Sequence, residues 1–231
     1  MRLATLDGFL EVPDGKSMVL IGPPGSGKTV LCQNILCEAL RKDLSCMHVL
    51  TQTPPQETVE NMRLLGMDAP PPNRFIIVDL YSWVLGETVS GSYSVSNLSD
   101  MAGVNVVLSS AADALGGRSL VIFDTISTLV SYNSEDLTVR FLRSHLARMK
   151  KLCNTGFYAV EEGIQTESFY NSLRLLFDGV LELKLTENDG KLKRFIRVHS
   201  LKGFNHDTAW RRFKIVNRVF QLSSEGGKEM C

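Results

Sequence analysis

Short apolar runs alternate with segments of helical periodicity along most of the chain, a pattern that predicts parallel strands joined by crossover helices. The expected strands are residues 17–21, 46–50, 75–78, 119–124 and 157–160. The expected helices are residues 30–40, 56–65, 100–115, 134–152 and 168–176. Four more apolar runs, at 179–185, 193–201, 212–216 and 219–222, read as C-terminal strands. The predicted fold class is α/β, with a mostly parallel central sheet flanked by helices and with C-terminal antiparallel strands.

Several finer expectations follow from the same pattern. Residues 86–99 are polar and rich in Gly, Ser and Thr, so we expect a mobile loop there. The helix at 134–152 is expected to bury Leu137 together with Phe141, Leu142 and Leu146. Without an internal repeat or linker, we expect one domain over residues 1–222 and a flexible tail over 223–231.

The most specific motif is Gly22-Pro23-Pro24-Gly25-Ser26-Gly27-Lys28-Thr29, which reads G-x-x-x-x-G-K-T between an apolar strand and a helical segment. Its glycines let backbone N–H groups point inward, so that they and the helix N-terminus form a site for a polyphosphate. Lys28 is expected to reach the β- and γ-phosphates, and Thr29 to offer its hydroxyl to Mg²⁺. The alternative, a glycine-rich turn that matches by chance, does not explain the flanking elements. The motif predicts a nucleoside-triphosphate site.

Asp124 ends the apolar run that begins at Leu120, downstream of this loop. Phosphate-loop proteins place an acid at such a strand end to hold Mg²⁺, directly or through water. The alternative is a strand end without chemistry. We predict that Asp124 and Thr29 share the metal.

Size and composition narrow the protein class. The 231 residues are 44% hydrophobic, enough for one substantial core, and 25 basic residues balance 25 acidic ones. The balanced charge gives no reason to expect a nucleic-acid partner. No run approaches 18 uninterrupted apolar residues, so we expect no membrane insertion. Five cysteines without a C-x-x-C pair, and no signal-peptide pattern, predict a reduced, cytoplasmic environment.

Over nearly its whole length the chain resembles the RecA superfamily, in particular KaiC-like and RadA-like ATPases. The matching segments beside the phosphate loop are Leu6-Asp7-Gly8, Gly15-Lys16-Ser17, Asp124-Thr125-Ile126-Ser127-Thr128-Leu129, Phe177-Asp178-Gly179-Val180 and Leu201-Lys202-Gly203-Phe204-Asn205-His206. The resemblance implies a RecA-like P-loop domain that binds ATP with Mg²⁺. It also implies a homo-oligomeric ring, such as a hexamer, with sites between subunits.

One departure from the family lies after the second predicted strand. KaiC-like enzymes carry a Glu pair there, before a Pro, and one Glu activates the attacking water. Here the matching positions are Gln52 and Thr53, and residues 45–56 contain no acid. An amide can orient water but cannot take its proton at pH 7. We interpret Gln52 as a degenerate general-base position; the alternatives are that it substitutes poorly, or that Glu57 and Glu60 reach inward.

A second departure lies in the C-terminal strands, where family members project a K-x-R pair onto the neighbouring subunit's γ-phosphate. The matching positions are Ser200 and Lys202. Lysine lacks the planar fork with which arginine clamps phosphate oxygens. Lys202 is therefore either a weakened trans-acting cation or a solvated charge on an edge strand.

Two other groups allow more than one interpretation. Glu161 and Glu162 follow a predicted strand, and we interpret them as part of a solvated acidic loop; contact with a metal-bound water or a partner's cation is the alternative. Phe169, Tyr170 and Trp210 are expected to pack or to line subunit contacts, rather than to stack on bases.

These expectations favour an ATP-binding switch or assembly component with weak or no hydrolysis and an unknown protein partner. The alternatives are an active ATPase that drives a motor or remodelling step, and a recombinase-like paralogue that binds single-stranded DNA. The zero net charge and the acidic loop argue against the last. No sequence feature marks a self-phosphorylation site.

Overall fold

The computed structural model describes residues 2–5, 9–68, 71, 73–85, 93–188 and 190–223. Its strands are β1 (Arg2–Thr5), β2 (Leu10–Pro13), β3 (Ser17–Gly22), β4 (Cys46–Leu50), β5 (Phe75–Asp79), β6 (Leu120–Asp124), β7 (Thr155–Glu161), β8 (Gly179–Asn188), β9 (Lys191–Leu201), β10 (Arg211–Val216) and β11 (Val219–Leu222). Its helices are α1 (Lys28–Arg41), α2 (Pro55–Leu64), the 3₁₀ turn η1 (Ser82–Leu85), α3 (Met101–Ala114), α4 (Ile126–Tyr132), α5 (Glu135–Lys151) and α6 (Glu167–Leu176).

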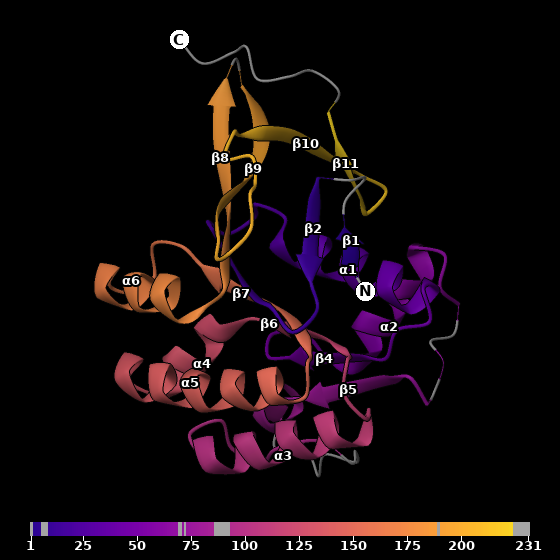
Figure 1. Cartoon of the computed structure of the whole chain (residues 1–231), viewed down its shortest axis with the longest axis vertical. Coiled ribbons are helices and arrows are strands. Elements are labelled where there is room, and N and C mark those ends of the chain that lie inside the picture. The colour runs from indigo at the N-terminus through magenta and orange to yellow at the C-terminus, as the bar shows by residue number, and fades with distance from the viewer. Residues whose placement is uncertain are drawn as a thin grey trace.

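One nine-stranded sheet runs through the molecule in the order β11-β10-β9-β8-β3-β7-β6-β4-β5 (Figure 1). The strands from β8 to β5 pair in parallel, whereas β9, β10 and β11 add on as antiparallel strands. The predicted fold class, a mostly parallel α/β sheet with C-terminal antiparallel strands, is confirmed.

Helices cover both faces of the parallel strands, which is why those strands read as continuous apolar runs. Val121 and Phe123 of β6 pack into the core formed with α3, α4, α5 and α6. Leu120 and Ile122 of the same strand pack on the opposite side, in the core that includes α1 and α2. Alternate residues of one strand therefore belong to two different cores.

Side-chain caps fix where several helices begin. Ser134 accepts a hydrogen bond from the backbone N–H of Leu137 at the start of α5, and Thr166 accepts one from Phe169 at the start of α6. Asp100 accepts one from Gly103 at the start of α3. Such caps satisfy N–H groups that have no partner inside the helix.

The structure departs from the sequence expectations in a few places. The β1–β2 hairpin and α4 had not been predicted; α4 is only seven residues long and directly follows β6. Leu137 is 41% exposed, because it lies in the first turn of α5 and faces away from the core. Its expected burial was wrong, while Phe141, Leu142 and Leu146 are buried.

Parts of the other expectations fall outside the described residues. Residues 86–92 of the expected mobile loop, residues 6–8 of the family resemblance and residues 224–231 of the expected tail are among them. In the described part of that loop, Val95 and Leu98 are buried, and Ser94 forms a bridge with Asp79. Ser223 donates its backbone N–H to the carbonyl of Arg212 at 2.9 Å. Within the described ranges, no helix is long and apolar enough to cross a membrane.

Candidate nucleotide-binding site

The parallel register brings the carboxyl ends of the central strands together at one edge of the sheet. Gly22 at the end of β3 pairs with Glu161 at the end of β7, and Leu50 at the end of β4 pairs with Asp124 at the end of β6. In α/β sheets this edge, where strand order reverses, is the usual place for a ligand. The phosphate loop, Gln52, Asp124 and Glu161 all lie there.

The phosphate loop occupies the connection between β3 and α1. The N–H of Ser26 donates to the carbonyl of Pro23 at 3.2 Å, and the first helical bond of α1 runs from Leu31 to Gly27 at 2.9 Å. Gly27 has a φ of 103°, and a Cβ there would lie 2.8 Å from Cδ1 of Ile215. The positive φ favours glycine at this position, whereas the contact with Ile215 is to the end of a flexible side chain that can move aside.

Lys28 is buried within this loop, with 4% of its side chain exposed. Its Nζ donates to the carbonyl of Gly22 at 2.7 Å and to that of Pro23 at 2.9 Å. It also forms an ion pair with Oε2 of Glu161 at 2.7 Å. In this conformation the lysine that was predicted to reach phosphates is held by a carboxylate of the protein itself.

Glu161 is the site-edge residue whose surroundings differ from the favoured sequence interpretation. It was expected in a solvated loop, but its side chain is only 17% exposed because it ends β7 beside β3; its neighbour Glu162 is exposed as predicted. The N–H of Glu161 donates to Oγ of Ser127 at 2.8 Å, and its carbonyl accepts the Tyr170 hydroxyl at 2.7 Å. Glu161 therefore connects Lys28 to α4 and α6.

The side chains of Asp124 and Thr29 lie close enough to interact. Burial raises the pKa of Asp124 to about 6, and the negative charge of Glu161 adds to this rise. The hydrogen bond from Thr29 and the charge of Lys28 act in the opposite direction. A divalent cation at this carboxylate would favour its ionised form.

Gln52 lies at the same edge, directly after the end of β4. The preceding residue, Thr51, donates its backbone N–H to the carbonyl of Asp124 at 3.1 Å, and the Gln52 side chain is exposed. Glu57 and Glu60 are exposed on α2, whose buried residues are Thr58, Asn61 and Met62. The alternative that either glutamate turns inward is therefore not supported by the fold.

Lys202 is not brought to the site of its own chain. It follows the end of β9, where Leu201 pairs with Gly179, and Gly179 in turn pairs with Met18 near the start of β3. The phosphate loop follows the other end of β3. The Lys202 side chain is exposed and donates to the carbonyl of Leu175 at 2.7 Å.

The antiparallel strands β9 and β10 contact the phosphate loop, although no local sequence motif predicted these contacts. Arg194 of β9 donates from Nε to the carbonyl of Gly25 at 3.4 Å, across 169 residues of sequence. Phe213 and Ile215 of β10 lie against Gly27. Their position beside the phosphate loop follows from the strand register alone, because an arginine or an apolar residue in a strand does not indicate a binding site in the sequence.

The chemistry of these groups fits a magnesium-bound triphosphate. The loop offers backbone N–H groups, the helix N-terminus and the Lys28 ammonium to phosphate oxygens. Thr29 and Asp124 supply the hydroxyl and carboxylate oxygens that P-loop proteins offer to Mg²⁺, which would neutralise charge on the phosphates. Among the residues with assigned positions, no cluster of three or more His, Cys, Asp and Glu side chains forms a protein-only metal site.

Comparison with known proteins agrees with this geometry. A UPF0273 protein of Thermotoga maritima is 26% identical over 94% of this chain and 91% of its own length. A UPF0273 protein of Methanocaldococcus jannaschii is 27% identical over 89% of this chain and 87% of its own length. The circadian clock protein KaiC3 of Synechocystis is 25% identical over 92% of this chain, which spans 42% of that longer relative. The family model described as "ATPase: KaiC" matches residues 4–225, so this chain, with its RecA-like sheet and phosphate loop, belongs to the KaiC ATPase family.

Proposed function

We propose that this protein binds Mg·ATP and uses the bound nucleotide as a switch or assembly signal, with weak or no hydrolysis. The ion pair between Lys28 and Glu161 carries the proposal. The Lys28 ammonium that should meet the phosphates already has a negatively charged partner, so a triphosphate must compete with Glu161 for it. The site thus offers two alternative arrangements of the same lysine.

A change at Glu161 would be transmitted because its backbone is held on both sides. Its N–H is bonded to Ser127 of α4 and its carbonyl to Tyr170 of α6. A nucleotide shifts a conformational equilibrium only through contacts that differ between the two states. Exchange of the Lys28 partner from Glu161 to phosphate is such a difference, and it lies where α4 and α6 meet β7.

Weak turnover is proposed from the residue at the general-base position. Gln52 is exposed at the carboxyl edge, and residues 45–56 contain no carboxylate. General-base catalysis contributes about 10²–10⁴-fold to a rate when a group of suitable pKa is in place. An amide retains the ability to orient water but not to accept its proton.

Assembly into a homo-oligomeric ring, such as a hexamer, is part of the same proposal. Lys202 is exposed at the sheet edge opposite the phosphate loop. Its ammonium could therefore approach a bound triphosphate only on a neighbouring copy. A protein partner would read the nucleotide-dependent state of the assembly.

An active ATPase is the second candidate, and one observation favours it. Once phosphate binds Lys28, the Glu161 carboxylate is released close to Asp124, whose pKa is raised mainly by burial and further by the nearby Glu161 charge. Such a carboxylate could accept a proton from water in place of the missing acid at Gln52. Loss of turnover in Glu161→Gln, with Mg·ATP binding retained, would support this candidate.

The deciding experiment measures Mg·ATP binding and ATP turnover on the same sample. Binding that disappears in Lys28→Ala, with turnover no higher than in that variant, is the result expected for a switch. Turnover that depends on Lys28 would instead establish the ATPase. Gln52→Glu then tests the base: a higher rate would identify the missing acid as the limiting defect, whereas no change would direct attention to Lys202 or to oligomer geometry.

A further inference from the structure

Charge is segregated along this chain although its formal total is zero. Residues 190–223 contain nine Lys and Arg residues and a single acid, Asp207. The rest of the chain therefore has sixteen basic and twenty-four acidic residues. A sum over the whole sequence conceals this separation. The local field at β9, β10 and β11 is that of a basic protein.

Many of these cations lie on one face of the antiparallel strands. Phe195 of β9 is directly opposite Lys184 of β8 on one side and Arg212 of β10 on the other. Residues directly opposite each other on neighbouring strands share a face, as do residues two apart on one strand. The basic and aromatic residues on this outer face are Lys184, Lys191, Lys193, Phe195, Arg197, Arg212 and Lys214; one acid, Glu182, lies on the same face opposite Arg197. Trp210 joins them through its contacts with Lys184 and Arg197.

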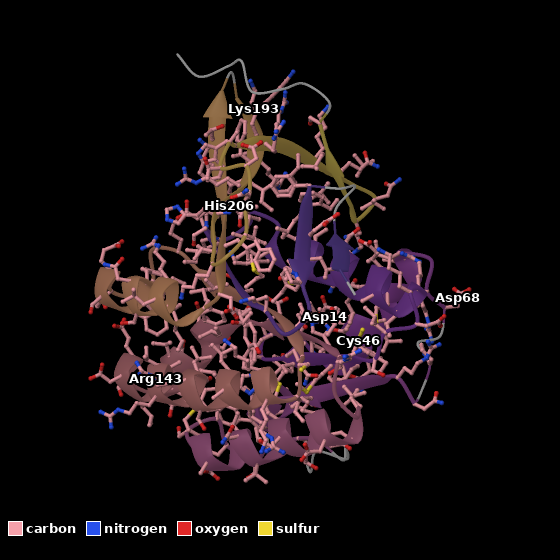
Figure 2. All side chains as sticks on the ribbon, viewed as in Figure 1. Asp14, Cys46, Asp68, Arg143, Lys193 and His206 are labelled. Atoms are coloured by element: carbon pink, nitrogen blue, oxygen red, sulfur yellow. The ribbon has the colours of Figure 1, made fainter. Side chains whose placement is uncertain are left out.

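This outer face is separate from the nucleotide site. Arg194, between two of its members, points to the other side and contacts Gly25, while Ile196 and Val198 are buried with α1. Figure 1 shows β8 and β9 projecting beyond the helices, and Figure 2 shows Lys193 in this projecting part and Arg143 on α5 at the other end of the molecule. The outer face therefore points away from the phosphate loop.

Aromatic rings lie among the cations. Lys184 Nζ is 4.3 Å from the centre of the Trp210 ring and 5.3 Å from that of Phe195, and the Arg197 guanidinium is 4.5 Å from the Trp210 ring. Arg197 is also oriented by Glu182, to which its Nε donates at 2.8 Å. Both rings are half-buried. The rings and the guanidinium plane together form an ordered surface for planar groups.

We propose that the outer face of β8, β9 and β10 binds single-stranded nucleic acid. Phosphates would contact the Lys and Arg side chains, and bases would stack against the Arg197 guanidinium and the accessible parts of the Phe195 and Trp210 rings. Positive grooves combined with aromatic side chains bind single strands with little dependence on sequence. An acidic protein surface would match the charge but would make no use of two rings interleaved with cations, so nucleic acid is the better match.

The test uses a fluorescently labelled oligo(dT) and the full-length protein, with anisotropy measured from 50 to 200 mM salt. Arg212→Gln with Lys214→Gln removes two cations of the outer face. At about 0.7 per neutralised phosphate, the slope of log K against log salt should become shallower by about 1.4, and binding at 50 mM salt should weaken roughly tenfold. Arg140→Gln with Arg143→Gln on α5 is the matched control, with the same charge change on exposed side chains.

Tryptophan fluorescence adds a local readout. The chain has two tryptophans, so Trp83→Phe leaves Trp210 as the single reporter, and its emission should be quenched on binding. Absence of binding at 50 mM salt, equal weakening in the α5 control, or binding without any change at Trp210 would each overturn the proposal. The proposal would also be overturned if Arg212→Gln with Lys214→Gln altered the oligomeric state in light scattering but left oligo(dT) affinity unchanged. The outer face would then be a contact between copies of the chain.

Discussion

Replacing Glu161 with glutamine removes the carboxylate that competes with a triphosphate for Lys28, while the side chain keeps nearly the same size. Glutamine still offers an oxygen to the ammonium, so the change isolates the charge of Glu161. In the parent protein this charge is 2.7 Å from Nζ of Lys28, at a position where 4% of the lysine is exposed. We expect Glu161→Gln to bind Mg·ATP more tightly.

The size of the effect follows from these contacts. A hydrogen bond to a charged group contributes about 1.5–3 kcal/mol to stability, and glutamine retains part of it. If half of that contribution is lost with the charge, nucleotide binding is relieved of about 0.8–1.5 kcal/mol, which corresponds to a Kd lower by roughly four- to twelvefold. The nucleotide-free protein should lose a similar amount of stability, although Gly22 and Pro23 still accept bonds from Lys28.

Isothermal titration calorimetry with Mg·ATP measures the affinity, and thermal unfolding measures the cost to the free protein. For a chain of this length, about 1 kcal/mol corresponds to a Tm lower by roughly 2–4 °C. Glu162→Gln is the control, because it removes the same charge from the exposed neighbouring residue. Its Kd and Tm should remain within error of the parent values.

An unchanged Kd in Glu161→Gln would refute the competition argument, since it would mean that the ion pair does not oppose nucleotide binding. A weaker affinity would show that Glu161 assists the bound state instead. Turnover measured on the same variant separates the two candidate functions. Tighter binding with no loss of rate fits a switch, whereas tighter binding with abolished turnover identifies Glu161 as the base.

Three further predictions concern titratable side chains. Burial raises the pKa of Asp124 from 3.8 to about 6, so the folded state loses stability as pH rises through this window. In urea unfolding, the free energy of unfolding of Asp124→Asn should exceed that of the parent by on the order of 2–3 kcal/mol at pH 7.5 and match it near pH 4. Burial raises the pKa of Asp178, but hydrogen bonds from Ser17 and Lys16 outweigh it and hold that pKa below its usual value. Asp178→Asn should therefore destabilise by about 1–3 kcal/mol at pH 7, with a gap that shrinks as pH falls below the usual carboxyl range; a gap independent of pH would contradict this. Both ring nitrogens of His48 are buried without a partner and its pKa is lowered to about 3, so His48→Leu should raise Tm, by more at pH 5 than at pH 7.

Local sequence patterns predicted much of the fold, because each strand and the helix after it are formed by neighbouring residues. The apolar run before Gly22 and the helical spacing after Thr29 define a strand, a loop and a helix without reference to the rest of the chain. The proximity of Thr29 and Asp124 was also predictable, since Thr29 comes after β3, Asp124 ends β6, and the carboxyl ends of parallel strands share one edge. The short α4 was missed because its seven residues span barely two turns.

Contacts over long separations could not be predicted in the same way. Lys28 and Glu161 are 133 residues apart, and their ion pair depends on β7 lying next to β3 with Gly22 opposite Glu161. An acid after a strand looks the same in sequence whether it meets solvent or a lysine. The outer face is similar: its cations are spread over three strands, and their common orientation depends on the register.

Strand β9 connects the two proposed sites, because successive residues of one strand point to opposite faces. Arg194 contacts Gly25 of the phosphate loop, whereas its neighbours Lys193 and Phe195 belong to the outer face. A nucleotide that moves Arg194 must therefore act on the backbone that presents the outer face. By linkage, any factor by which Mg·ATP changes oligo(dT) affinity must equal the factor by which oligo(dT) changes Mg·ATP affinity. If each ligand changes the affinity for the other by the same factor, and this factor differs from one, the two sites are coupled through the domain, and Arg194→Gln should bring both factors closer to one. If both factors equal one, the two sites are independent and β9 does not couple them.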